Sequence, residues 1–353
     1  MTKSVKGTSL LHKLGGVFLD IIPFKPYYDK QTHDDQINKI SEKNIDLSNN
    51  EINEIVRRLK NHSYYSLING YKPHFLLDGK TDEMKPGTTF DHFYQCKLLE
   101  MDLSSVLFKY IQVIEQGFRA RTSYIVAREF GTDHRVYLEA KYYVNTNNRR
   151  YKTLKYFREL HKKCNENSYS YYFKNQKKAA IPPWILFMDA EFYRVIILYS
   201  CLPQKLRDEI RHEYISPTNL VNENRLFADS LQLLREYRNI YAHSKRNFFE
   251  KINYSLDYDL SKFIPTAKLF DKNDFDSKKK SKKISTVVYL ALGYLNDPFL
   301  CRRFQNDLLN LFINNGYVDK NYDGVDLFNG QTVYDILDLP IDFFKKVNSY
   351  LSI

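Results

Sequence analysis

The sequence has few of the residues that usually interrupt helices, with only 12 glycines and 11 prolines among 353 residues. This scarcity favours a mostly helical protein with short connections, because glycine and proline are the commonest residues of turns. Cysteine is also scarce, and the four cysteines lie far apart, at positions 96, 164, 201 and 301. They form no zinc-like pairs, so free thiols in a reducing cytosol are the simplest account of them.

Long uninterrupted apolar runs are missing as well. The run LLHKLGGVFLDII near the N-terminus contains His12, Lys13 and Asp20, which argues against a secretory signal peptide. The longest later run, from Trp184 to Leu202, contains three charged residues and is not expected to span a membrane. The sequence also has no P-loop, no glycine-rich dinucleotide turn and no cluster of metal ligands. We therefore expect a cytoplasmic protein without a membrane partner, a cofactor or a bound metal.

Positive charge is abundant, with a formal net charge of +11 and a pI near 9.1. A chain this basic is expected to have an acidic partner, and nucleic acid is the commonest one. The alternative is a basic surface that serves solubility alone.

The charge is most one-sided between residues 141 and 178, where eleven Lys and Arg face only two acids. Seven Tyr and Phe from position 151 onward are interleaved with them. Cations that follow a phosphate backbone beside rings that stack on bases are typical of single-stranded RNA binding. The alternative is a solvated helix face whose rings point into the core. The residues predicted to bind RNA are Arg149, Arg150, Lys152, Lys155, Arg158, Lys162, Lys163, Tyr171, Lys174, Lys177 and Lys178.

Hydrophobic periodicity predicts a long helix from Asp91 to Phe130, ended by Gly131. A shorter helix over 47–59 is expected to start at a capping box formed by Ser48 and Glu51. The remaining expectations are a loosely ordered arm over 1–45, one central helix from Pro182 to about Leu202, a charged loop over 271–283, and helices over 284–314 and at the C-terminus.

The stretch LQLLREYRNIYAHSK, residues 231–245, is the one that indicates a chemistry. Asn239 and His243 are four residues apart, so on a continuing helix the amide lies beside the imidazole and can orient it. Arg238 lies about 140° round the helix from His243, so the two converge on one group only if the helix bends or two subunits share the site. An imidazole, a fixed cation and an amide suit RNA cleavage without a metal ion.

Spacing alone does not single out this pair. The chain holds three similar Arg–His spacings, at Arg57/His62, Arg128/His134 and Arg207/His212. The last of these is a real competitor, although an Asp follows its Arg where the orienting Asn would stand. The simplest alternative for His243 is a histidine favoured at a helix C-terminus by the helix dipole.

A resemblance adds to this interpretation. LREYRNIYAHS resembles the RN-x(3)-AH segment of HEPN domains, specifically those of the Abi family (AbiD/AbiF type) of bacterial abortive-infection proteins. Four further stretches agree with that family in order: SYYSLINGYKPHFL, TTFDHFYQCKLLEMDLSSVL, IEQGFRART and PPWILFMDAEFYRVIILYSCL. Where the family usually has a Glu after the Trp of the P-x-W segment, this chain has Met188, followed by Asp189.

The resemblance implies an all-α protein with a HEPN-type four-helix bundle core over residues 89–250. An N-terminal arm and helical segment (1–88) and a C-terminal helical domain (251–353) flank this core. The implied function is a toxin-like phage-defence endoribonuclease controlled by a structured noncoding RNA. His243 moves the proton, Arg238 contacts the scissile phosphate and Asn239 orients the imidazole. One such segment per chain implies a homodimer.

Two other functions remain open from the sequence. HEPN folds also serve as non-catalytic RNA-binding modules, so the chain is alternatively the protein part of a ribonucleoprotein with a noncoding RNA. A basic DNA-binding transcription factor is the third class.

Overall fold

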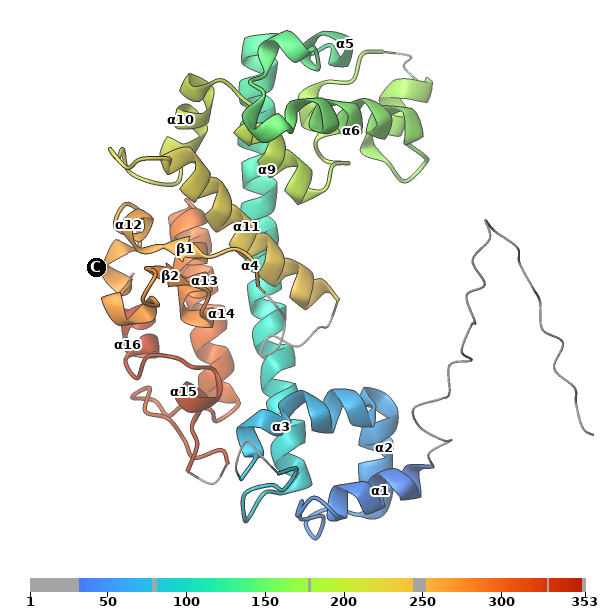
Figure 1. Cartoon of the computed structure of the whole chain (residues 1–353), viewed down its shortest axis with the longest axis vertical. Helices are drawn as coiled ribbons and strands as arrows, with labels where there is room; N and C mark the ends of the chain where they lie inside the picture. The colour runs from blue at the N-terminus through green and yellow to red at the C-terminus, as the bar shows by residue number, and fades with distance from the viewer. Residues whose placement is uncertain (1–31, 78–80, 177–178, 244–251, 329, 351–353) are drawn as a thin grey trace, which may run out of the picture.

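The structure is a computed structural model, in which the described residues are 32–77, 81–176, 179–243, 252–328 and 330–350. Helices dominate these residues and the paired strands among them are two short ones, which confirms the all-α expectation (Figure 1). The first helices are α1 (His33–Ser41), α2 (Ile52–His62), α3 (Gly70–Phe75), α4 (Phe90–Phe130), α5 (His134–Tyr137), α6 (Arg150–Lys163), α7 (Tyr169–Tyr171) and α8 (Pro183–Leu186). The later elements are α9 (Phe192–Ser200), α10 (Gln204–His212), α11 (Glu223–Ala242), β1 (Leu256–Asp257), α12 (Tyr258–Ser261), β2 (Lys280–Ser281), α13 (Ile284–Tyr294), α14 (Pro298–Asn314), α15 (Val333–Ile336) and α16 (Phe343–Tyr350).

Helix α4 runs through the whole molecule as its longest element, with 41 residues and a length of about 60 Å. Thr89 caps its first turn, and Gly131 ends it with a φ of 89°, a conformation that glycine adopts at little cost. Its buried positions recur every three or four residues, and they contact different partners along its length. The prediction of a helix over 91–130 is therefore confirmed.

Helix α11 crosses the middle of α4, and α9 and α10 complete this part of the core (Figure 1). The buried side chains of α11 include Phe227, Leu231 and Leu234, each with no exposed surface. Burying an apolar side chain of this size contributes about 1.5 to 3 kcal/mol, so this face fixes the helix on α4. The polar end of α11 is thereby held at a fixed place beside α4.

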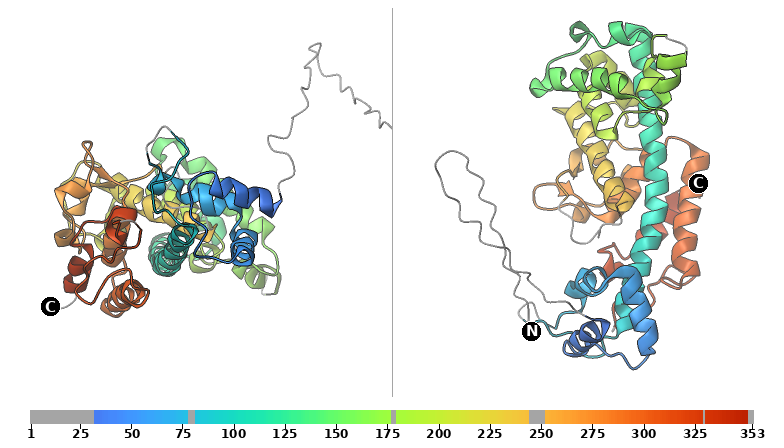
Figure 2. Two further views of the ribbon diagram at one scale, coloured as in Figure 1. Left: turned by 90° about the horizontal axis from the view of Figure 1, so that it is seen from below. Right: turned by 90° about the vertical axis from the view of Figure 1, so that its right-hand side faces the viewer.

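The C-terminal elements pack against the same two helices. Every residue of α13 is buried, and α13 contacts both α4 and α11. Helix α14 lies along α4 in both views, and its Asp307 accepts hydrogen bonds from Lys109 (2.6 Å) and Tyr110 (2.7 Å) of α4 (Figure 2). Strands β1 and β2 pair antiparallel, with Leu256 opposite Ser281. The apolar side chains of all these parts form one continuous core.

The N-terminal helices α1, α2 and α3 lie together at the end of the molecule where α4 begins, and α3 packs against α4 (Figures 1 and 2). The expectation of a loosely ordered arm is wrong for residues 33–41, which form α1 and bury Ile40 completely; residues 1–31 lie outside the described part. The Ser48 capping box is also wrong. Ser48 donates to the carboxylate of Asp46, and Glu51 stands at the N-cap of α2 without a side-chain bond.

The apolar stretch after Pro182 is two helices, α8 and α9, and not the single central helix expected from the sequence. The break falls at Asp189, whose carboxylate accepts hydrogen bonds from the backbone N–H groups of Tyr169 (2.8 Å) and Ser170 (2.9 Å). This side chain therefore caps the start of α7 from a distance in sequence, a role that periodicity does not reveal.

We predict opposite effects of alanine at two helical glycines. A Cβ at Gly293 would stand 2.5 Å from Ile264 Cγ2 and 2.9 Å from Thr266 Oγ1, so Gly293→Ala should lower the free energy of unfolding by about 2 kcal/mol. A Cβ at Gly117 meets only the end of the Arg121 side chain, which can shift at the cost of a 3.2 Å hydrogen bond to Tyr214. Gly117→Ala should therefore raise the free energy of unfolding by about 0.5 kcal/mol. Urea unfolding measures both, and a loss at Gly117 as large as that at Gly293 would contradict the packing described.

Candidate functional site

The predicted site residues lie at the exposed end of α11. The helix ends at Ala242, and the backbone N–H of His243 still donates to Asn239 O at 3.1 Å. The helical path therefore continues to His243, whose side chain is exposed. Arg238 and Asn239 are half-buried one turn earlier.

A buried carboxylate on α4 holds Arg238. Arg238 Nε lies 3.1 Å from Glu115 Oε2, and the other oxygen of Glu115 accepts from Arg119. Glu115 is only 2% exposed, so its charge needs both guanidinium partners. Burial lowers the pKa of Arg119, an effect that Glu115 opposes and Arg238 reinforces. We call Glu115, Arg119 and Arg238 the Glu115 cluster; it holds one negative and two positive charges.

Two more arginines lie next to rings close to this cluster. Arg194 of α9 stacks 4.6 Å from the Tyr156 ring, and Arg235 of α11 lies 5.2 Å from the Tyr193 ring. Burial raises the pKa of Tyr156, whose charge interactions extend to Arg119. Each of these arginines also faces a carboxylate of its own, Arg194 with Glu191 at 3.7 Å and Arg235 with Glu236 at 3.8 Å. The excess positive charge in this region therefore comes from the Glu115 cluster. In the sequence, the four-residue spacing of Glu115 and Arg119 on a helix indicates only a local pair and not the contact with Arg238.

Among the described residues, no hydrogen bond joins the Asn239 amide to the His243 ring. Its Oδ1 accepts from Arg238 Nη1 at 3.2 Å, so the amide helps to fix the guanidinium. Arg238 and His243 are likewise not joined by a hydrogen bond. Arg238 and His243 lie on different sides of the helix end, as their five-residue spacing predicts. The amide of Asn239, which the spacing places on the same face as His243, is bonded to Arg238 instead.

A groove of about 490 Å³ starts beside the Glu115 cluster. Phe108 connects the two, because it lines the groove while its ring lies 5.9 Å from the Arg238 guanidinium. Tyr241 also lines the groove, and its buried hydroxyl has no hydrogen-bond partner within the described residues. Burial raises the pKa of Tyr241 well above its ordinary value, so the hydroxyl stays protonated and remains a donor.

Comparison with known proteins identifies the family. The family model described as Abi-like protein matches residues 57–249, more than half of the chain. The chain belongs to the Abi-like protein family. The match includes the Glu115 cluster and His243, and membership suggests a role in abortive infection, a form of phage defence. No curated protein and no solved structure matches this Abi-like protein.

The basic segment of the Abi-like protein divides into two groups of cations. Arg150 donates to Tyr143 O (3.0 Å), Arg158 to Leu138 O (2.6 Å) and Lys174 to Lys162 O (2.8 Å), so these three stabilise the local backbone. The exposed side chains without such bonds are Arg149, Lys152, Lys155, Lys162 and Lys163. Lys177 and Lys178 lie outside the described residues.

The rings of the basic segment divide in the same way. Phe157 is completely buried, whereas Tyr151 is 70% exposed and Tyr169 is 57% exposed. Tyr171, the ring predicted to bind RNA, is half-buried. The rings available for stacking therefore include Tyr151 and Tyr169, which periodicity could not separate from the buried ones.

The competing Arg–His pairs have other partners. Next to His212, Arg211 is 2% exposed and binds Glu223 at 2.6 Å, and its Nη2 lies 2.9 Å from the His212 ring. His134 Nδ1 accepts from the backbone of Ile181 at 3.1 Å. His212 therefore contacts Arg211 and His134 contacts Ile181, and no hydrogen bond joins them to Arg207 or Arg128 in the described part of the chain.

Two further findings concern the described part of the chain. It contains no group of three or more His, Cys, Asp or Glu placed to share a metal ion. None of its helices combines the length and the apolar character needed to cross a bilayer.

We predict that Glu115→Ala lowers the free energy of unfolding by about 2 to 3 kcal/mol, because it leaves Arg119 and Arg238 without their buried partner. The cost stays below that of a fully buried pair, since both arginines can turn toward water. The control is Glu139→Ala, which breaks an exposed pair with Lys141 and should leave the urea midpoint nearly unchanged. Equal midpoints for the two variants would contradict the role of Glu115.

Proposed function

We propose that this Abi-like protein is a cytoplasmic, RNA-directed defence protein that cleaves RNA without a metal ion through a HEPN-type site at Arg238, Asn239 and His243. The observation that carries the proposal is the fixed position of Arg238, which Glu115 holds near the edge of a groove, one helical turn before the exposed His243. The resemblance of this helix end to the RN-x(3)-AH segment supports the assignment.

The reaction is an internal transfer at one phosphodiester. The RNA 2′-oxygen attacks phosphorus as its proton passes to the His243 imidazole, and the bond to the 5′-oxygen breaks. The products are a 2′,3′-cyclic phosphate and a 5′-hydroxyl, which receives a proton. Arg238 offsets the charge that develops on the phosphate oxygens, and the buried Glu115 keeps the guanidinium in place.

RNA would approach across the exposed cations of the basic segment. Lys152, Lys155, Lys162 and Lys163 lie on α6 and are exposed, with Tyr151 beside them. Phosphates bind to such lysines with little sequence preference, and the exposed rings stack on bases. The noncoding RNA expected from the resemblance fits this surface.

The active form is proposed to be a homodimer. Arg238 and His243 lie on different sides of the end of α11, so one chain supplies only part of a cradle around a phosphate. A two-fold dimer with the two helix ends adjacent would bring a second copy of each residue to the site.

One observation favours the alternative of a non-catalytic ribonucleoprotein. Asn239 Oδ1 accepts from Arg238 rather than orienting His243, so the imidazole is not held in one tautomer by its neighbour. On this alternative the exposed cations of α6 bind the noncoding RNA and the chain cleaves nothing.

We expect His243→Ala to reduce RNA cleavage and growth arrest at least about a hundredfold, the usual contribution of a general acid or base. The matched control is His212→Ala, which removes an exposed histidine that also follows an arginine by five residues. Cleavage is measured on fractions sized by light scattering, with a cyclic phosphate as the product. Growth arrest lost in His212→Ala and kept in His243→Ala would refute the site, and activity in a strictly monomeric fraction would refute the dimer alone.

Replacing Lys152, Lys155, Lys162 and Lys163 together by Gln should weaken RNA binding and flatten its salt dependence. Each lost phosphate contact lowers the slope by about 0.7 for single-stranded RNA. The control replaces four exposed lysines of the C-terminal part, Lys262, Lys268, Lys320 and Lys345, and changes the net charge equally. If both quadruple variants show the same salt slope, the α6 surface is not the RNA interface.

A further inference from the structure

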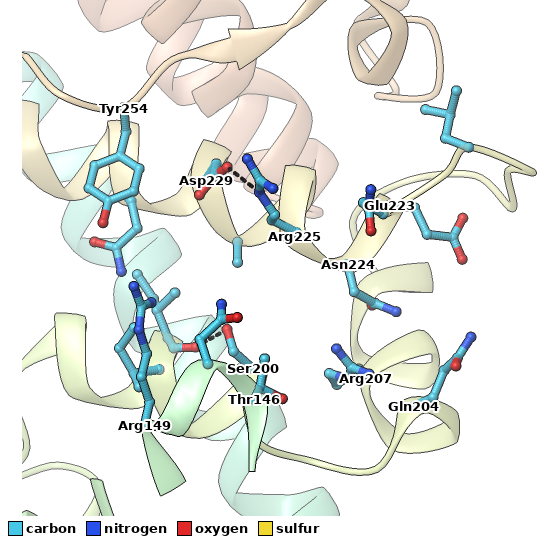
Figure 3. A pocket seen from close by; sticks show the side chains of 17 residues that line it. Thr146, Arg149, Ser200, Gln204, Arg207, Glu223, Asn224, Arg225, Asp229 and Tyr254 are labelled. Carbon is cyan, nitrogen blue, oxygen red and sulfur yellow. Dashed lines mark hydrogen bonds and ion pairs between the residues drawn. The ribbon is translucent and has the colours of Figure 1, made fainter. Parts of the chain in front are cut away.

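A second hollow, of about 470 Å³, lies between α9, α10 and the first half of α11, closed on one side by the turn that carries Thr146 and Arg149 (Figure 3). Its volume falls in the range of small-molecule sites, about 300 to 1,000 Å³. Gln232, which lines it, precedes Arg238 by six residues, or about 9 Å along the helix. The hollow is therefore separate from the groove at Tyr241, and the proposed nuclease does not use it.

Gln232 is the most informative residue of this hollow. It is only 2% exposed, and within the described residues neither its Oε1 nor its Nε2 has a hydrogen-bond partner. Buried amides are nearly always bonded, because an unpaired one loses its contacts with water and gains nothing in return. An amide that lines an open hollow gains both bonds when a ligand presents an acceptor next to a donor.

The charges of the hollow favour an anion. Its two acids are already engaged, since Glu223 pairs with Arg211 at 2.6 Å and Asp229 faces Arg225 at 3.8 Å. Arg149 and Arg207 have no ion pair with a carboxylate of the described chain, and Arg207 Nε is buried without a hydrogen bond.

In Figure 3 these two arginines stand on opposite sides of the hollow, Arg149 near Tyr254 and Arg207 near Gln204. Two guanidinium groups on opposite walls, neither of them neutralised by an acid, suit the oxygens of a phosphate that lies between them.

The other walls suit a flat ring. Tyr254 supplies an aromatic face, and Ile196, Ile197 and Leu220 supply apolar contacts. We propose that this hollow binds one nucleotide unit, with the base against Gln232 and Tyr254 and the phosphate between Arg149 and Arg207. Each base offers a donor next to an acceptor on its Watson–Crick edge, which matches the Gln232 amide. The unit is either a free nucleotide or one unstacked nucleotide of a bound RNA, and the chemistry of recognition is the same.

The test titrates RNA-free full-length protein with the four nucleoside monophosphates, the matching nucleosides and single-stranded RNA decamers, using calorimetry. Gln232→Leu should weaken binding about 5- to 150-fold, the range for a lost bidentate base contact. The double variant Arg149→Gln, Arg207→Gln should lower the affinity for the monophosphates about tenfold or more, while the affinity for the nucleosides stays unchanged. The control is Lys205→Gln, which removes an exposed cation of α10 that does not line the hollow.

The outcomes are distinct. Loss of monophosphate binding in Gln232→Leu supports a free nucleotide, and loss confined to the decamers supports an unstacked RNA nucleotide. Gln232→Leu breaks no hydrogen bond of the described chain, so the melting temperature of this variant should equal or exceed that of the wild type. Gln232→Met serves as a second variant. A lower melting temperature in both, or unchanged affinity for every ligand, would overturn the proposal. Calorimetry measures binding and not cleavage, so a failed nuclease assignment leaves this result intact.

Discussion

The crossing of α11 over α4 is the contact on which the rest of the molecule depends. Its interior is apolar, and at its edge the carboxylate of Glu115 binds arginines from both helices. The apolar contact supplies the stability, while the ion pairs fix the direction in which Arg238 points. A buried carboxylate with two cationic partners is costly to break, because each removal leaves a charge without compensation. The position of Arg238 in the candidate site therefore depends on how α11 packs against α4.

The cations of the chain serve two purposes, and the difference follows their chemistry. Arg150 and Arg158 reach back to carbonyl oxygens, because the guanidinium presents several donors in a fixed fork. Lys152 and Lys163 remain in solvent, where a compact and strongly hydrated ammonium group is most stable. The total of 53 Lys and Arg therefore overstates the number of cations that a nucleic acid can reach.

Helix α11 borders two hollows that share one property. The Tyr241 hydroxyl lines the groove at its C-terminal end, and the Gln232 amide lines the hollow near its start. Neither group has a hydrogen-bond partner in the part of the chain that the structure describes. A core built for stability alone would place apolar side chains at such positions. A buried polar group without a partner needs an explanation, and a ligand that supplies the missing hydrogen bond is one.

The sequence alone determined the local features of this protein. The period of the apolar residues and Gly131 determined the bounds of α4, and the charge imbalance over 141–178 identified the basic segment. Such features depend on neighbours three or four residues away, which a reader of the sequence can see. The RN-x(3)-AH and P-x-W segments, in that family's order along the chain, indicated the family. They did not indicate which side chains are in contact.

Only the tertiary structure decided the contacts between distant parts of the chain. Glu115 and Arg238 are more than a hundred residues apart, so no local spacing could pair them. Asp189 breaks a helix that periodicity predicts as continuous, because its carboxylate caps the start of α7 twenty residues earlier. Gln232 reads in the sequence as an ordinary helical residue. Its burial and its lack of partners arise only when α9, α10 and α11 enclose it, since burial is a property of packed surfaces and not of the order of residues.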